Sequence, residues 1–240
     1  MIKLNILAFA AHPDDVELAC AGTLAKHAEM GENVGVIDFT EGEMGTRGTP
    51  QKRLEEAAKS ADILGLKVRE NLGFKDAYFK NDLIHQTEIV KKIRQYQPDI
   101  VLANAVSDRH PDHGRASELI SESVFLAGLK KFETKDDNGN AQEAYRPNKV
   151  YHYIQSLPIK PDFLVDVSNQ WEKKMNAIRA FDSQFYKAGS EEPETYISSP
   201  RFMKMIEARA MEFGQIIGVD YAEGFTVERY LGVKDLNGLI

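Results

Sequence analysis

The chain has 240 residues, of which 42% are hydrophobic and 28% are charged, and its formal net charge is −7. This composition is typical of a folded globular protein, and the lack of a basic excess argues against a nucleic-acid partner. No apolar run approaches the roughly 20 residues that cross a bilayer, so we expect no membrane partner. The single cysteine, Cys20, excludes an internal disulfide and favours a reducing compartment. Because the first predicted strand begins close to Met1, a signal peptide has no room, and we predict a cytoplasmic location.

Strand and helix signals alternate along the first half of the chain. The apolar stretch 4–9 predicts a strand, and a helix-compatible run at 17–30 ends before Gly31, a frequent helix stop. Further strands are predicted at 33–39, 68–72 and 99–103, and further helices at 53–64, at 84–96 and, after residue 113, to about residue 131. In the helix at 84–96, we expect Ile84, Val90 and Ile93 to reach the core.

The second half of the chain continues with the same two kinds of element. Strands are predicted at 150–154 and 163–167, and helices at 170–185 and 200–217. The polar stretches 40–50 and 135–145 are predicted to be loops. The alternation predicts one domain over residues 1–240, with an α/β fold in which helices cover both faces of a doubly wound, mostly parallel sheet.

Two polar clusters follow predicted strands. One is His12-Pro-Asp-Asp15, after the strand at 4–9, and the other is His110-Pro-Asp-His113, after the strand at 99–103. The carboxyl ends of parallel strands are where ligands bind in open α/β sheets, and sheet topology can bring these two strands side by side.

A catalytic zinc site needs three protein ligands and an open position, and His12, Asp15 and His113 would supply them. Asp14 would stay free to take a proton from a water activated by the metal, and a protonated His110 could stabilise a developing oxyanion. This set of groups suits hydrolysis of an amide or an ester.

Structural explanations exist for several of these residues. An Asp-Asp pair before a helix can serve as its N-cap and compensate the helix dipole. Glu17 could orient a histidine ligand, or could simply be an acid in the first turn of a helix. Cys20 is expected to pack as a small hydrophobic residue. We expect His27, His85 and His152 at the surface or in loops, although His152 follows a strand and could approach the site.

The two motifs, A-H-P-D-D-x-E at 10–17 and H-P-D-H at 110–113, resemble those of the LmbE/PIG-L family of metal-dependent de-N-acetylases. Enzymes of this family remove acetyl groups from N-acetylglucosamine conjugates, and the resemblance covers almost the whole chain. Residues 40–49 with Arg53, together with 183–185, 206–210 and 221–225, look like the branch that acts on N-acetylglucosaminyl-malate in bacillithiol biosynthesis.

The resemblance implies a Rossmann-like fold and a zinc ion, although Fe(II) can serve in such sites. It makes His12, Asp15 and His113 the metal ligands, Asp14 the general base and His110 the group that stabilises the tetrahedral intermediate. It is also consistent with Asp112 orienting His110 or a metal ligand, and a plain turn-forming role stays open. Homohexamers occur in this branch, so a homo-oligomer is expected.

A malate-bearing sugar has two carboxylates, which arginine can bind in a bidentate manner. Arg53 matches a substrate-contacting arginine of the family, and Arg109, beside His110, is a second candidate. Arg47 and Arg109 could equally be solvated loop cations. Tyr196, in the polar loop at 189–199, could close over the substrate.

Three other classes of function are alternatives to a metal-dependent deacetylase. A nucleotide-binding module is disfavoured because no G-x-G-x-x-G follows the first strand. A metal-dependent phosphoesterase, esterase or peptidase could use the same ligands. A non-catalytic binding protein would not need Asp14 as a free carboxylate beside an open metal position. The sequence therefore predicts zinc-dependent hydrolysis of the acetamide of a small amino-sugar conjugate, either N-acetylglucosaminyl-malate or another N-acetylglucosamine conjugate.

Overall fold

One sheet runs through the middle of the molecule. The computed structural model describes residues 2–186, 191–233 and 235, and within them seven strands pair in the order β3-β2-β1-β4-β5-β7-β6. The strands are β1 (Ile6–Ala10), β2 (Val34–Thr40), β3 (Val68–Phe74), β4 (Ile100–Ala103), β5 (Lys149–Tyr153), β6 (Phe163–Asp166) and β7 (Ala222–Val227). The five strands from β3 to β5 run parallel, whereas β7 is antiparallel to both β5 and β6.

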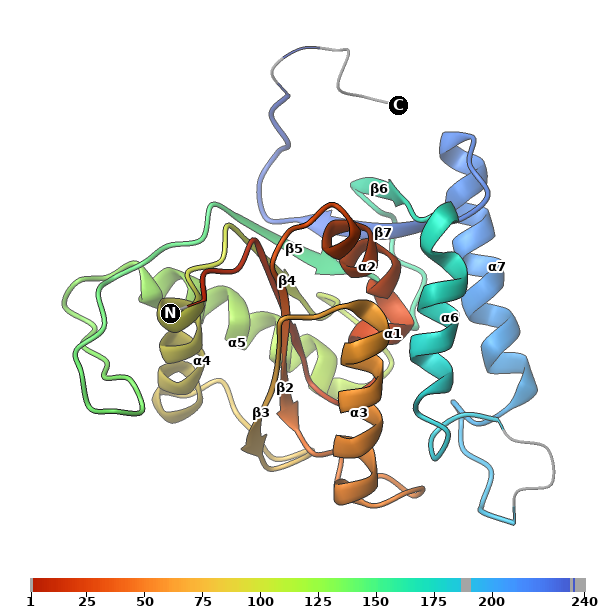
Figure 1. Ribbon diagram of the computed structural model, residues 1–240, viewed down its shortest axis with the longest axis horizontal. Helices are drawn as coiled ribbons and strands as arrows, with labels where there is room; N and C mark the ends of the chain where they lie inside the picture. The colour runs from red at the N-terminus through yellow and green to blue at the C-terminus, as the bar shows by residue number, and fades with distance from the viewer. Residues whose placement is uncertain (1, 187–190, 234, 236–240) are drawn as a thin grey trace.

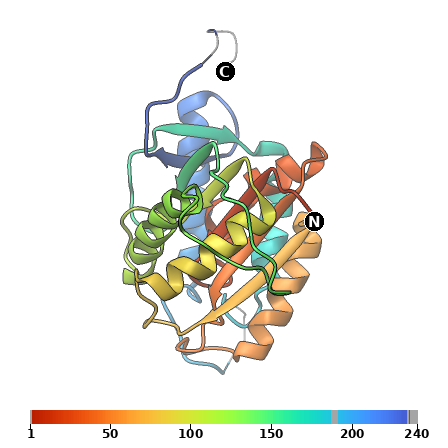
Figure 2. The same ribbon diagram turned by 90° about the vertical axis from the view of Figure 1, so that its left-hand side faces the viewer.

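Helices cover both faces of this sheet (Figure 1). The helical segments are α1 (Asp15–Ala19), α2 (Ala21–Glu29), α3 (Pro50–Leu64), α4 (Leu83–Tyr96), α5 (Pro111–Ala127), η1 (Ser168–Gln170), α6 (Trp171–Arg179) and α7 (Pro200–Ile217). Helices α4 and α5 lie on one face, in front of the sheet in Figure 2, and α1, α2, α3, α6 and α7 lie on the other. The predicted α/β fold with a mostly parallel sheet and helices on both faces is confirmed.

The central strand β1 is buried on both sides, and its side chains alternate between the two layers. Leu7 and Phe9 join the core beneath α4 and α5. Ile6 and Ala8 join the core beneath α1 and α2. This explains why β1 is apolar without interruption, as is typical of a parallel strand covered on both faces.

The strand β7 was not predicted from the sequence. Its stretch contains Gly224 and Glu223, which are both unfavourable in strands. The structure compensates for each of them. A Cβ atom on Gly224 would lie 2.7 Å from Phe213 Cε2, so only glycine lets α7 pack this closely. The buried carboxylate of Glu223 pairs with Lys174 at 2.6 Å.

Two helix predictions need correction. The predicted helix at 17–30 is two helices, because Cys20 adopts a φ of −133° and α2 starts anew, with the Glu223 carboxylate accepting hydrogen bonds from the N–H groups of Gly22 and Thr23. The helix predicted at 170–185 ends at Arg179, at the end of α6. Cys20 is fully buried, as expected for a packing residue.

Two predictions about burial were wrong. Ile84 is 74% exposed, whereas Val90 and Ile93 are fully buried. Ile84 and Ile93 are nine residues apart, or two and a half helical turns, and therefore lie on opposite sides of α4. His152, expected at the surface or in a loop, is buried in β5, where its ring contacts Ser117 and Glu228.

Candidate metal and catalytic site

The two polar clusters meet at the carboxyl edge of the sheet. The strands β1 and β4 are neighbours, and the chain reverses its direction of progress across the sheet between them, which is where ligands bind in such folds. A cavity of about 380 Å³ opens there. Its walls include most of the residues predicted for the site, namely His12, Asp14, Asp15, Arg53, Arg109, His110, His113 and Tyr196.

The carboxylate of Asp15 lies between the two predicted histidine ligands. His113 Nε2 is 3.0 Å from Asp15 Oδ1, and His12 Nδ1 is 3.7 Å from Asp15 Oδ2. The side-chain amides of Asn104 and Gln155 donate hydrogen bonds to the same carboxylate at 3.0 and 2.9 Å. Burial opposes ionisation of Asp15, but the contacts with His113 and His12 hold its pKa well below the usual value. Asp15 is therefore an ionised, fixed oxygen donor.

Each of the two histidine rings is held at its other nitrogen by carboxylates. His12 Nε2 lies 3.1 Å from Asp76 Oδ1 and 3.4 Å from Asp112 Oδ2. His113 Nδ1 lies 2.6 Å from Asp108 Oδ2. Histidines that ligate metals commonly donate the second ring N–H to a carboxylate, which fixes the tautomer and turns the free nitrogen toward the metal.

This donor set fits a zinc ion. The free nitrogens of His12 and His113 both face Asp15, and two imidazoles with one carboxylate are the ligands of many catalytic zinc sites. Burial alone would lower the pKa of His113, but Asp15 and Asp108 raise it to about 9, so metal binding has to displace a proton from this ring. One ring nitrogen from each of His12, His110 and His113 lies within 4.8 Å of the other two, so His110 borders the same position.

Asp14 precedes α1 in an unusual backbone conformation. Its φ is 123°, which residues other than glycine rarely adopt and which costs about 1–3 kcal/mol. The side chain is buried, and Arg53 Nη2 donates a hydrogen bond to Asp14 Oδ2 at 3.0 Å. Burial raises the pKa of Asp14 to about 7, although the charge of Arg53 opposes this shift. A carboxylate of this pKa beside the metal position is well suited to be a general base.

The Arg53 guanidinium donates hydrogen bonds to several groups of the protein. In addition to Asp14, it donates to the carbonyl oxygens of Pro13 at 2.6 Å and Gly42 at 3.3 Å. A Cβ atom on Gly42 would lie only 1.8 Å from Arg53 Nη1, so glycine is needed there for the guanidinium to fit. The structure thus shows that Arg53 holds Asp14 at the wall of the cavity, and its predicted contact with a substrate carboxylate stays a prediction.

His110 is the N-cap residue of α5, and Pro111 occupies the first turn of that helix. Its Nδ1 accepts a hydrogen bond from the backbone N–H of Asp112 at 3.3 Å, which places the ring proton on Nε2. Burial and the neighbouring His12 and His113 lower the pKa of His110. Both observations favour a neutral His110 ring over the predicted protonated one, and a neutral ring can also donate a hydrogen bond from Nε2 to an oxyanion.

Asp112 and Glu17 have distinct partners. The carboxylate of Asp112 faces His12 and also accepts a hydrogen bond from the N–H of Ala77. The carboxylate of Asp112 therefore orients a predicted metal ligand, whereas its backbone N–H bonds to the His110 ring. Glu17 instead binds Ser60 Oγ and the Arg69 guanidinium, so the prediction that it orients a histidine was wrong. Its contacts connect α1 to α3 and β3.

Arg109 and Tyr196 lie together in the cavity wall. The Arg109 guanidinium carbon is 4.2 Å from the centroid of the Tyr196 ring, in a cation–π arrangement. Tyr196 is 46% exposed. The predicted loop at 189–199 begins outside the described residues, at 189 and 190, and only its part from 191 onward is described.

Four residues of the site were not predicted from the sequence: Asp76, Asn104, Asp108 and Gln155. Asn104 directly follows β4, and Gln155 lies two residues beyond β5. Their position at the carboxyl ends of parallel strands was the signal that could have identified them. Asp76 lies two residues beyond β3 and carries the same signal.

Among the described residues, no helix is both long enough and apolar enough to cross a membrane.

The cavity lies where the strand order of the sheet reverses. It contains two histidines held by carboxylates, an aspartate between them and a second buried carboxylate, and these groups are typical of a metal-dependent hydrolase with an α/β fold. The chain belongs to the PIG-L family, since the family model described as GlcNAc-PI de-N-acetylase matches residues 7–124. Diacetylchitobiose deacetylase of Thermococcus kodakarensis is 32% identical over 92% of this chain and 81% of its own length.

Two further comparisons show the range of similar proteins. The crystal structure of the conserved protein TT1542 from Thermus thermophilus has a TM-score of 0.83 and 35% identity, and the match covers 96% of this chain and 98% of that one. A 4-oxalmesaconate hydratase of Pseudomonas putida is 25% identical over 92% of this chain and 87% of its own length. The prediction of an enzyme of the metal-dependent deacetylase type is confirmed by membership in the family.

Proposed function

We propose that this enzyme is a zinc-dependent deacetylase that hydrolyses the acetamide of an N-acetylglucosamine conjugate to a free sugar amine and acetate. The observation that carries the proposal is the pair of histidines, each held by a carboxylate at one nitrogen and turned toward Asp15 at the other. The family model and the diacetylchitobiose deacetylase, whose names describe removal of acetyl groups from amino sugars, support the same reaction.

The residues of the site divide the chemistry among them. His12, Asp15 and His113 would hold the metal, and a zinc ion there would polarise the acetamide carbonyl and acidify a water molecule. Asp14 accepts the proton of the attacking water, and Arg53 holds the Asp14 carboxylate in place. His110 donates a hydrogen bond from Nε2 to the oxygen that gains negative charge.

For the substrate, we infer N-acetylglucosaminyl-malate, which would place the enzyme in bacillithiol biosynthesis in the cytoplasm. Support comes from Arg109, which faces the cavity and has no carboxylate partner among the residues that the structure describes. A neutral sugar would not need such a cation, whereas malate supplies two carboxylates. A homo-oligomer remains a prediction of the resemblance to this branch.

The test is acetate release from N-acetylglucosaminyl-malate, diacetylchitobiose and free N-acetylglucosamine. The protein is stripped of metal with a chelator and assayed with and without added zinc, with Fe(II) as a second metal. We expect release that depends on zinc and is fastest for the malate conjugate. Release that favours another conjugate would retain the reaction and change the substrate. If no substrate releases acetate although zinc is bound, the deacetylase proposal is wrong, and ester hydrolysis or water addition, as in the related hydratase, would be examined instead.

A further inference from the structure

The cavity is also lined by Arg209, which has no part in the proposed reaction. Arg209 lies on α7, one residue before the buried Ala210 and three after the buried Ile206, and its side chain lines the cavity wall. The residue is partly buried, and the loss of hydration lowers the pKa of its guanidinium. It therefore brings a positive charge close to the site of reaction.

Arg209 has fewer hydrogen-bond and ion-pair partners than three other arginines of the structure. Its one hydrogen bond within the described residues runs from Nη2 to the carbonyl oxygen of Leu18 at 3.1 Å. Arg53 and Arg69, in contrast, are each paired with carboxylates. Arg94 donates to four oxygens. Within the described residues, Arg209 has neither an ion pair nor such a set of hydrogen bonds, although the charges of Glu223 and Asp108 act on it.

A guanidinium carries several N–H donors. Those of Arg209 that have no hydrogen-bond partner are accessible to solvent, and the residue lines the cavity. A partly buried cation with few hydrogen bonds loses hydration that the protein replaces only in part. An anion in the cavity would remove this cost. The carboxylate is the best geometric match, since it can accept two parallel hydrogen bonds from the guanidinium fork.

We propose that Arg209 binds a carboxylate of the group attached to the sugar and thereby selects an anionic conjugate over a neutral one. This inference rests on the deacetylase function proposed above and specifies its substrate class. Arg109 lines the same cavity and also lacks a carboxylate partner among the described residues, so the site offers two guanidinium groups. A dicarboxylate such as malate can occupy both.

A purely structural role would be different. The bond to the carbonyl oxygen of Leu18 connects α7 to α1, and losing this connection would impair turnover of every substrate alike. The two roles can therefore be separated by comparing an anionic and a neutral substrate in the same variant.

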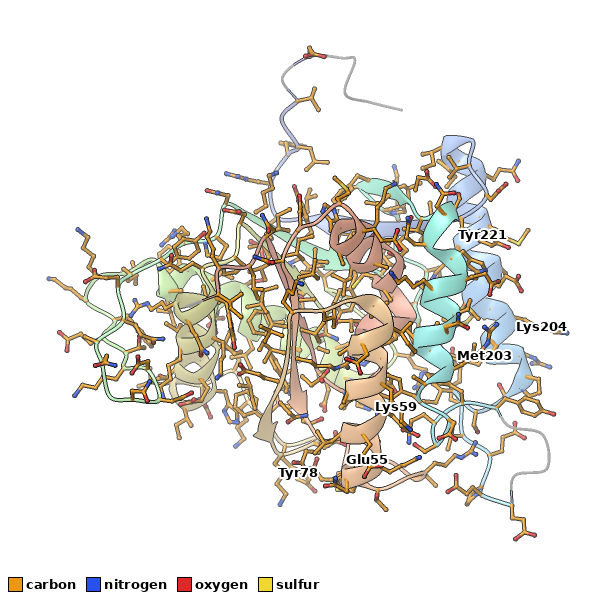
Figure 3. The ribbon with its side chains drawn as sticks, viewed as in Figure 1. Glu55, Lys59, Tyr78, Met203, Lys204 and Tyr221 are labelled. Atoms are coloured by element: carbon orange, nitrogen blue, oxygen red, sulfur yellow. The ribbon has the colours of Figure 1, made fainter. Side chains whose placement is uncertain are left out.

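The test uses the zinc-loaded enzyme with Arg209→Met and Arg209→Lys. Lys204→Met is the matched control, because Lys204 is exposed on the same helix and points away from the body of the protein (Figure 3). We measure kcat and KM with N-acetylglucosaminyl-malate and with free N-acetylglucosamine. Removing a charged hydrogen bond should lower the preference for the malate conjugate, as a ratio of kcat/KM values, by about 10- to 100-fold. Most of the loss should appear in KM, Arg209→Lys should retain part of the preference, and Lys204→Met should retain all of it.

A binding measurement separates this inference from the proposed function. Calorimetry with L-malate should show binding to the wild-type enzyme and to Lys204→Met, and at least tenfold weaker binding to Arg209→Met. Equal falls of kcat/KM on both substrates, or malate binding unchanged in Arg209→Met, would overturn the role of Arg209. If no substrate releases acetate, the proposed function fails, and the malate titration still tests the anion site by itself.

Discussion

Gly42→Ala tests the idea that Arg53 acts by holding Asp14. Gly42 has a φ of +66°, where any residue with a Cβ is strained by about 1–2 kcal/mol. The new methyl group would also lie 1.8 Å from Arg53 Nη1 and 2.5 Å from Arg53 Cζ, so the guanidinium has to move. Its hydrogen bond to Asp14 would then be lost, and a bond between charged groups of this kind contributes about 1.5–3 kcal/mol.

If the whole free energy of this bond is lost from the transition state, kcat/KM falls by about 10- to 100-fold. Gly139→Ala is the matched control, because Gly139 has a φ of +82° and its added Cβ atom would have no neighbour within 4 Å. Urea unfolding should show a loss of about 1–2 kcal/mol in Gly139→Ala from backbone strain, and a larger loss in Gly42→Ala because Arg53 is also displaced. Only Gly42→Ala should lose activity in the acetate-release assay. If the two variants keep equal activity, Arg53 does not act through Asp14.

Further substitutions test the other members of the site. Asp14→Asn should retain zinc but lose turnover by about 10²- to 10⁴-fold, as expected for a general base, and near-normal turnover would contradict that role. His113→Ala should lose zinc on dialysis, as measured by metal analysis, and an unchanged metal content would remove His113 from the ligands. Asp108→Asn should weaken zinc binding by about 10- to 100-fold, because His113 loses the carboxylate that orients it, and competition with a chromogenic chelator would measure the change. Unaltered affinity in Asp108→Asn would show that the 2.6 Å contact does not tune the metal site.

The sequence by itself determined the strands that carry the site and most of the groups at their ends. The uninterrupted apolar stretches of β1 and β4 predict buried parallel strands, because only strands covered on both faces can be apolar throughout. His12 lies two residues beyond β1 and His110 lies seven residues beyond β4, and this chain order is enough to place both at one edge of the sheet.

Only the tertiary structure decided how these groups pair. Asp76 is 64 residues from His12, and Gln155 is 140 residues from Asp15, so their contacts depend on strand order and register. No local periodicity encodes such distant contacts. The hydrogen bond from Arg53 to Asp14 also depends on the tertiary structure, whereas the sequence predicted only a substrate contact for Arg53. The sheet edge at β7 was missed for the same reason, since Gly224 and Glu223 are favourable there only because Phe213 and Lys174 pack against them.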